Sequence, residues 1–211
     1  MRLAPLLVGL VTLAGCSTIE RSTSMFPNRS RDWRLVATQD DQKRLRDWRS
    51  SFVDAIAAAR GAGQGPAIDR EGALLQPDAV LAGGALADGV YGCRLVRVGA
   101  KNAGNMAFAS SGPLTCRVSA DGRLQQLVML GGVQRQMGLV FPGDPVRQVF
   151  LGTLMLPGED RAMQYGADEN RDVAGYVEQI APQRWRLIMP APHFDSRLAV
   201  LELVPAPMGV R

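Results

Sequence analysis

The sequence is poor in the side chains that bind soft metals or nucleic acids. Its 211 residues include one histidine, His193, and arginine carries nearly all of the positive charge because the only lysines are Lys43 and Lys101. A zinc site needs several histidine or cysteine ligands, so we expect no metal centre and no other cofactor. The 24 basic residues face 20 acidic ones and form no basic run. A nucleic-acid surface needs clustered basic side chains with stacking aromatics, so we expect no nucleic-acid partner.

Recognisable catalytic motifs are missing as well. No Gly-x-Ser-x-Gly turn presents a nucleophile to His193, and this histidine, which lies among prolines, is predicted to be an ordinary loop residue. Residues 168–172 resemble the start of a calcium loop, but Val173 stands where an EF-hand needs glycine and Gln179 where it needs glutamate. The sequence therefore predicts a protein that is not an enzyme.

The N-terminal apolar run is too short for a permanent membrane span. Residues 3–13 provide about half the length that a spanning helix needs. They follow Met1-Arg2 and end in Leu13-Ala14-Gly15-Cys16, which is the layout of a secretory signal. Leu-Ala-Gly-Cys resembles the lipobox of bacterial lipoproteins. This resemblance implies a signal peptide over residues 1–15 and palmitate-type acylation of Cys16. The alternative is a secreted protein whose signal happens to end in cysteine.

A lipidated Cys16 would place the protein on a membrane of the cell envelope, facing the periplasm. Two or more acyl chains hold a protein stably on a membrane. Ser17 follows the cysteine, which by resemblance to enteric lipoproteins favours the outer membrane over the inner one. The polar residues 16–32 are predicted to form a flexible tether.

The two remaining cysteines, Cys93 and Cys116, form an even pair in an oxidising compartment. We expect them to form a disulfide, and the alternative is two buried free thiols. Strand alternation places Cys116 on the buried side with Leu114 and Val118.

Residues 33–86 are predicted to form a helical segment. Thr38 is a suitable N-cap for a helix over residues 38–60, and apolar residues recur there at steps of three and four. Residues 61–66 are expected to form a loop, and a second short helix is expected near residues 77–82.

Residues 87–206 show the pattern of an antiparallel β domain. Short alternating segments, one of them at residues 162–165, are separated by turn signals. We expect about eight to ten strands in a meander that closes into a small barrel, because closure removes exposed edges. A flattened sandwich is the alternative. The helix would plug one end of the barrel or lie along its outside.

A binding site is predicted from arginine and aromatic residues in or beside these strands. One hypothesis is an arginine-lined barrel mouth that accepts an anionic or amphipathic ligand. If Arg147 points into the barrel it needs a partner, and Glu178 and Glu202 are the candidates; the simpler alternative is a buried ion pair or outward-facing side chains. The candidate residues are Arg135, Arg147, Tyr165, Arg171 and Trp185.

Several motifs resemble an uncharacterised bacterial family, domain of unknown function 4893. They are Tyr165-Gly-Ala-Asp-Glu-Asn-Arg-Asp-Val-Ala-Gly175, Arg184-Trp-Arg-Leu187, Glu202-Leu-Val-Pro205, Val90-Tyr-Gly-Cys-Arg94, Leu114-Thr-Cys-Arg117 and Phe150-Leu-Gly-Thr153. The likeness covers about residues 33–205 and implies no activity, ligand or catalytic residue. A looser likeness to calycin-type barrels concerns the fold alone.

The sequence thus predicts an envelope lipoprotein with a non-enzymatic binding barrel. In one version the barrel encloses a small amphipathic molecule, which requires an interior cavity. In another the domain binds or inhibits an envelope protein. An unrecognised hydrolase is the third alternative, and it requires a cleft in which at least two titratable groups converge.

Overall fold

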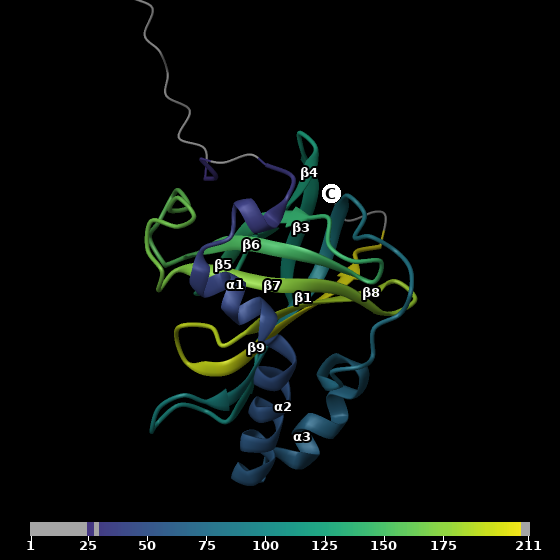
Figure 1. Ribbon diagram of the computed structural model, residues 1–211. Helices are drawn as coiled ribbons and strands as arrows, with labels where there is room; N and C mark the ends of the chain where they lie inside the picture. Colours follow the sequence, from purple (N-terminus) through teal and green to yellow (C-terminus); the bar gives the residue numbers. More distant parts are fainter. Residues whose placement is uncertain (1–24, 28–29, 208–211) are drawn as a thin grey trace, which may run out of the picture.

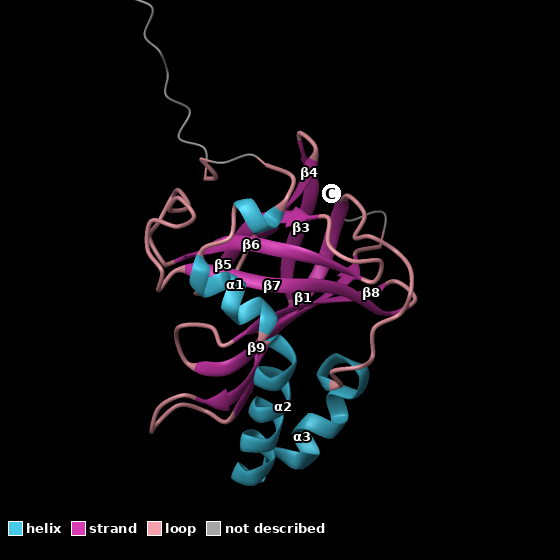
Figure 2. Ribbon diagram, viewed as in Figure 1, coloured by secondary structure: helices cyan, strands magenta, loops and turns pink. Residues whose placement is uncertain are grey.

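A helical segment precedes a mainly β domain in the computed structural model, which describes residues 25–27 and 30–207 (Figures 1 and 2). The helices are α1 (Gln39–Arg46), α2 (Trp48–Ala59) and α3 (Gly65–Glu71). Short helical turns cover Trp33–Leu35, Arg60–Gln64 and Gly72–Leu75. The predicted class, a mainly β fold behind an N-terminal helix, is confirmed.

The predicted helix over residues 38–60 begins as expected but is divided in two. The Thr38 side chain caps α1 by accepting a hydrogen bond of 3.2 Å from the Asp41 N–H. At Asp47 the backbone turns to φ −89° and ψ 9°, which interrupts the helix. The chain continues beyond α2 through a kink at Gly63, where φ is 82°, into α3, which has a proline in its first turn. The helix therefore breaks within the range 61–66 predicted as a loop, but at one residue and not over the whole range.

The strands form one antiparallel meander that closes on itself. Their order follows the sequence from β3 to β9, and β1 pairs with both β3 and β9. The described residues thus form an eight-stranded barrel of β1 and β3–β9, as expected. The short strand β2 pairs with residues 96–98 in the second half of β1. The strands are β1 (Gly89–Ala100), β2 (Phe108–Ser110), β3 (Leu114–Asp121), β4 (Leu124–Met129), β5 (Arg135–Phe141), β6 (Arg147–Met155), β7 (Asp172–Ala181), β8 (Arg184–Pro190) and β9 (Ser196–Pro205).

Apolar side chains fill the barrel interior. Val118 and Cys116 of β3 belong to this core, as the alternation predicted, and so do Phe150, Leu187 and Leu201. Apart from Leu86, the remaining members are alternate residues of neighbouring strands, so the layers pack against one another as in a solid core.

A pair of glycines makes room for the largest interior ring. Gly138 of β5 and Gly152 of β6 lie opposite each other in the ladder. A Cβ atom added to either would come within 2.6 or 2.7 Å of Phe150 Cζ. Phe150 therefore occupies the space above two bare backbones, and this contact depends on the absence of side chains at both positions.

The predicted disulfide between Cys93 and Cys116 is present and joins β1 to β3. The two Cα atoms are 5.9 Å apart, within the usual range for a bridge. On the chain-entropy estimate, closing this loop stabilises the fold by roughly 3.5 kcal/mol.

One end of the barrel is closed by the segment that leads into β1. Leu86 of this segment is 1% exposed and belongs to the interior core. Its N–H donates to Gln148 Oε1 at 3.1 Å, and the Trp185 Nε1–H donates to the Gly84 carbonyl at 3.0 Å. These bonds fix the segment across the barrel end, so the plug is a loop and not the helix.

The helices lie along the outside of the barrel. Phe52, Ala55 and Ala59 of α2 pack with Val96 and Val200 from the outer faces of β1 and β9, and Figure 1 shows α2 beneath this part of the barrel. Strands in this region are thus buried on both faces, which explains their nearly continuous apolar sequences.

The first described residues, 25–27, also pack on the barrel. Phe26, which the sequence assigned to the tether, is 2% exposed and stacks on Tyr165 with ring centroids 5.2 Å apart. The Met25 carbonyl accepts a hydrogen bond of 2.9 Å from the Tyr165 N–H. The folded domain therefore includes part of the segment that was expected to be a tether.

Candidate functional site

The open end of the barrel contains a small cavity near the point where β7 and β8 separate. Their pairing extends to Tyr176 and Ile188, and the β8–β9 loop borders the gap beyond. The cavity has a volume of about 40 Å³, enough for a few water molecules. Its lining residues are Arg44, Leu95, Arg97, Gln134, Gln136, Leu154, Asn170, Arg171, Asp172, Val173, Ala174, Met189, Pro192, His193, Phe194, Asp195, Ser196 and Ala199.

Besides Arg44, whose buried Nε atom has only an ion pair with Asp40 at 3.3 Å, three residues that line the cavity have a buried polar atom without a hydrogen-bond partner in the described part of the chain. The atoms are Oε1 of Gln136 on β5, Oδ2 of Asp172 on β7 and Nε2 of His193 in the β8–β9 loop. Gln136 is 6% exposed and Asp172 is 3% exposed. Folded proteins leave few buried polar groups unpaired. Three of them around one cavity indicate a place for a polar ligand or for ordered water.

Three arginines line the cavity, and they differ in their partners. Arg44 of α1 forms ion pairs with Asp41 and with Asp40, the latter at 3.3 Å. Arg171 is paired with Glu159. Arg97 of β1 donates to the Gln134 Oε1 atom at 2.9 Å, and no described carboxylate lies within 4.0 Å of it.

Burial changes the pKa values of two groups at the cavity. It raises the pKa of Asp172 to about 6, although the Gly166 N–H that binds Oδ1 at 2.9 Å opposes the shift. Burial, assisted by the positive charge of Arg44, lowers the pKa of His193. At neutral pH the imidazole is therefore uncharged, and Asp172 takes up a proton as the pH falls through about 6.

The β8–β9 loop is held in a strained conformation. Ala191 has a φ of 44°, in the left-handed region that residues other than glycine rarely adopt. Its N–H donates to the Arg197 carbonyl at 2.9 Å, and the Asn105 side chain donates to the Asp195 carbonyl at 2.9 Å. Strain of this kind is maintained by surrounding contacts and clusters at functional sites, so the loop offers a preformed wall for the cavity.

A shallower groove continues from the cavity along the β1–β2 hairpin. Arg97, Asp195 and Ser196 line both. The groove has a volume of about 320 Å³ and also touches Asn105 and Met106. A ligand with a small polar end in the cavity would therefore have room for a larger body outside it.

Two titratable groups, Asp172 and His193, meet at this cavity, which is the arrangement that a hydrolase requires. Ser196 also lines it. However, the buried His193 Nε2 makes no hydrogen bond to a described residue, so the contact between nucleophile and base that activates a serine is not formed through this nitrogen.

The predicted site residues are distributed over several places. Arg171 lines the cavity, and Arg135 lies near it because both arginines bind Glu159, Arg135 through the backbone carbonyl at 2.9 Å. Tyr165 lies behind α1, where its hydroxyl donates to Asp41 and accepts from the Thr38 N–H at 3.1 Å. Burial and the Asp41 carboxylate raise the pKa of Tyr165.

Arg147 and Trp185 lie away from the open end. Arg147 does not point into the barrel: it donates to Glu178 Oε2 at 2.6 Å on the outer face and lies 4.7 Å from the Trp48 ring centre. The reason is that Arg147 shares a face with Val149 and Leu151, and that face is covered by the N-terminal segment. Trp185 packs against Tyr91 at the closed end.

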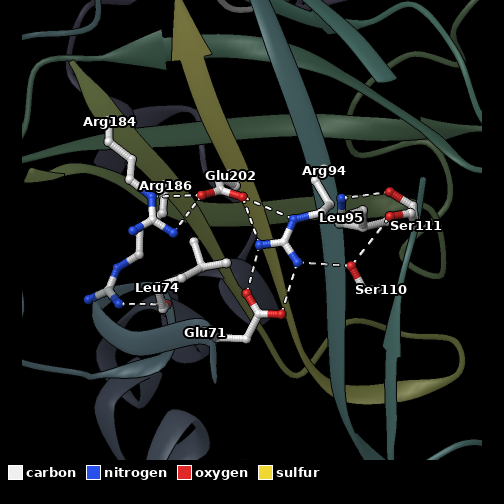
Figure 3. A network of polar contacts seen from close by, with 9 residues as sticks. All are labelled: Glu71, Leu74, Arg94, Leu95, Ser110, Ser111, Arg184, Arg186 and Glu202. Atoms are coloured by element: carbon white, nitrogen blue, oxygen red, sulfur yellow. Dashed lines mark hydrogen bonds and ion pairs between the residues drawn. The ribbon is translucent and has the colours of Figure 1, made fainter. Parts of the chain in front are cut away.

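Two polar networks outside the cavity attach the helical segment to the barrel. Arg186 is fully buried, binds Glu178, and donates to the carbonyls of Ala73 and Leu74 at 2.8 Å. Figure 3 shows the second network, in which Arg94 lies between Glu202 of β9 and Glu71 of α3, at 2.8 and 2.7 Å. Their donors are engaged by protein atoms, so these networks join elements and offer little to a ligand.

Sequence reasoning missed the residues that distinguish the cavity. Arg97 is two residues from Leu95 on β1 and therefore lies on the same face of the strand. Because Leu95 is apolar, this spacing was a usable signal that the Arg97 side chain faces the barrel interior. Gln136 alternates with Gly138 and Val140 in the same way. Asp172 was noticed only as part of the rejected calcium loop at residues 168–172, and His193 was interpreted as an ordinary loop residue.

The described residues also bear on two other kinds of site. They contain no group of three or more histidine, cysteine or acidic side chains that is placed to hold a metal ion. They likewise contain no helix with the length and apolar character needed to cross a membrane.

Residues 33–203 match the model of a protein family described as domain of unknown function (DUF4893). The chain belongs to this family. The match covers the helices and nearly all of the barrel, so the DUF4893 domain includes both the cavity and the helical layer. No curated protein and no solved structure matches the chain, and the looser likeness to calycin-type barrels stays a prediction.

Proposed function

We propose that this chain is a lipid-anchored envelope protein whose DUF4893 domain is a non-enzymatic binding module. The observation that carries the proposal is the cavity at the open end, with its three residues that keep buried polar atoms unpaired. Leaving such an atom unpaired costs about 1–3 kcal/mol. A ligand that supplies the missing hydrogen bonds recovers part of this free energy.

The filled interior directs the ligand to the open end. Phe150, Leu187 and Leu201 belong to a continuous core inside the barrel, and the plug around Leu86 closes the other end. A small amphipathic ligand enclosed in the interior, as in the first version of the prediction, would have to displace these side chains. The same ligand is accommodated more easily by the cavity and its adjoining groove.

The proposed anchor lies outside the described residues. Residues 1–15 would be the signal peptide, and Cys16 would carry the acyl chains. Ser17 supports a position on the periplasmic face of the outer membrane. A direct test is metabolic labelling with radioactive palmitate. We expect label in the wild-type chain and none after Cys16→Ser, with Ser17→Ala as the control; label that persists after Cys16→Ser would contradict the anchor.

Binding at the cavity is tested by thermal unfolding against a library of envelope metabolites. A ligand at 100 times its Kd stabilises the folded state by about 2.7 kcal/mol, which raises Tm by several degrees. Gln136→Leu keeps the size of the side chain and removes its acceptor, so the shift should fall. Gln126→Leu is the control, because Gln126 lies on β4 and does not line the cavity. A library without any Gln136-dependent shift argues against the module.

A protein partner at the same end is the second candidate function. Met106, Leu130 and Val133 are 66%, 44% and 72% exposed, and all three lie in connections at the open end of the barrel. Exposed apolar side chains of this kind mark interaction sites when they gather. Photo-crosslinking from position 133 in intact cells should then give one reproducible adduct, and position 117 on the barrel wall should give none.

A further inference from the structure

Arg97 is the cavity residue whose charge is least balanced by the protein. Its side chain is half-buried on β1, and its hydrogen-bond partner among the described residues is the neutral side-chain amide of Gln134, at 2.9 Å. Arg44 and Arg171, which line the same cavity, are each paired with carboxylates. A guanidinium group has five N–H donors in a planar fork, so most of the hydrogen-bonding capacity of Arg97 is available to a ligand.

We propose that Arg97 binds a carboxylate group of the ligand at the open end of the barrel. This inference rests on the proposed binding function and names the ligand class. A carboxylate matches the arginine fork with two parallel hydrogen bonds. Gln136 lines the same cavity with an unpaired acceptor, Oε1, which suits a ligand that carries a hydroxyl or amide N–H as well as its acid group.

The surroundings of Arg97 favour a singly charged group over a phosphate dianion. Asp172 and Asp195 line the same cavity, and their negative charges oppose a second charge on the ligand. The volume of about 40 Å³ admits a group the size of a carboxylate or a few waters. The groove that shares Arg97, Asp195 and Ser196 with the cavity leaves room for whatever is attached to the acid.

Two sources supply this chemistry: a free small organic acid and the C-terminus of a peptide. Both present one carboxylate, and a peptide also presents an amide N–H, which is the kind of donor that the Gln136 Oε1 atom lacks. The test therefore needs probes that separate the carboxylate itself from the molecule that carries it.

The experiment is an NMR titration of the purified chain, observed at the arginine Nε–H signals. The probes are acetate, the neutral analogue acetamide, the dipeptide Ala-Ala, its C-terminal amide and inorganic phosphate. We expect saturable shifts with acetate at a Kd on the order of 1–10 mM and tighter binding of Ala-Ala if the source is a peptide. Acetamide and the amidated dipeptide should bind at least 10-fold more weakly.

Two variants connect the binding to this side chain. Arg97→Gln should weaken acetate binding about 10- to 100-fold. Arg97→Lys keeps the charge but loses the fork, and an intermediate loss is expected. Arg117→Gln is the control: it removes the same charge from an exposed position on β3 and should leave binding unchanged. Arg97→Lys also serves as the test if Arg97→Gln does not fold.

The outcomes separate this inference from the function on which it rests. Carboxylate binding that persists in the Arg97 variants, phosphate binding tighter than acetate, or no saturation by either acid up to about 100 mM would each overturn it. Gln136-dependent binding of a neutral metabolite in the thermal assay would then still support the binding module. Failure of both assays would reject both proposals.

Discussion

Asp172 is the first residue of β7 and is buried beside α1, and only one of its two carboxylate oxygens has a hydrogen bond. Its Oδ1 accepts the Gly166 N–H at 2.9 Å, while Oδ2 has no partner among the described residues. Thr153, the residue opposite it on β6, also has a buried hydroxyl without a partner there. Burial therefore favours the protonated acid, which explains why its pKa is raised to about 6.

Asp172→Asn is expected to stabilise the protein at neutral pH but not in acid. The folded pKa lies above the unfolded one, so the folded state binds the proton more tightly. The contribution of Asp172 to stability is fully present below about pH 4 and is lost as the pH rises through about 6. Asparagine keeps an acceptor for Gly166 and stays neutral, so the variant should gain about 1–3 kcal/mol at pH 7.5 and little at pH 4.

Urea unfolding at the two pH values measures this difference. Asp54→Asn is the matched control, because Asp54 is exposed on α2, and its effect should be small at both values. If Asp172→Asn instead loses the same stability at pH 4 and at pH 7.5, burial does not raise the pKa of this carboxyl group.

At the scale of strands, the contact between β5 and β6 sets how tightly the barrel is packed. Gly138 and Gly152 lie opposite each other, and an added Cβ would approach Leu151 O or Met137 O to 2.3 Å as well as the Phe150 ring. Backbone atoms cannot move away as easily as the end of a flexible side chain. We therefore expect Gly138→Ala to lower the free energy of unfolding by about 2–3 kcal/mol.

Thermal unfolding checks this expectation. Gly112→Ala is the control, because nothing lies within 4 Å of a Cβ at that position and its φ is ordinary. If overpacking is the cause, adding Phe150→Leu to Gly138→Ala should raise Tm above that of the Gly138→Ala single variant. A Gly138→Ala protein as stable as the wild type would contradict the close approach.

The sequence predicted most elements that are built by alternation and missed those that depend on context. The barrel strands and the inward position of Cys116 follow from a period of two and were correct. The predicted strand at residues 162–165 is a loop, because its residues bind the N-terminal segment through the Met25 carbonyl instead of a neighbouring strand. Residues 77–82, where a second helix was expected, form turns and irregular chain, and α3 lies earlier, at Gly65–Glu71.

The candidate site was harder to predict because it joins distant elements. Arg97, Gln136 and His193 belong to β1, β5 and a loop, and no local spacing relates them. Arg171 was selected because it is polar and beside a strand, and it does line the cavity. The same criterion selected Arg147, whose side chain the helices cover instead. Pattern reasoning identified which residues are unusual, but the packing of the helices decides which of them meet.

On the scale of the whole molecule, the helical layer and the barrel depend on each other. Phe52, Ala55 and Leu74 are fully buried against the outer faces of the strands, and the Arg186 and Arg94 networks join the same surfaces (Figure 3). Burial of each large apolar side chain contributes about 1.5–3 kcal/mol. Several such side chains together equal the entire stability of a typical domain.

A chain that lacks residues 33–75 is therefore expected not to form a stable barrel. Without the helices, the outer faces of β1, β8 and β9 would be exposed, and Glu178 would keep two arginines in an uncovered apolar surface. Circular dichroism and size-exclusion chromatography should show an aggregated or unfolded product. A chain that begins at residue 25 is the control and should remain monomeric and folded. A monomeric, cooperatively melting barrel from the shorter chain would contradict this dependence.

The pairing of β1 with β9 also determines when folding is complete. Cys93 lies opposite Leu203, and the same ladder reaches Pro205, so the first and last strands of the barrel must meet before it closes. Contacts between residues so far apart in the sequence form slowly, because a long loop must be ordered first. A growing or emerging chain therefore leaves one edge of β1 unpaired and the apolar barrel interior uncovered until β9 is available. During that interval the protein depends on whatever shields unfolded chains from aggregation.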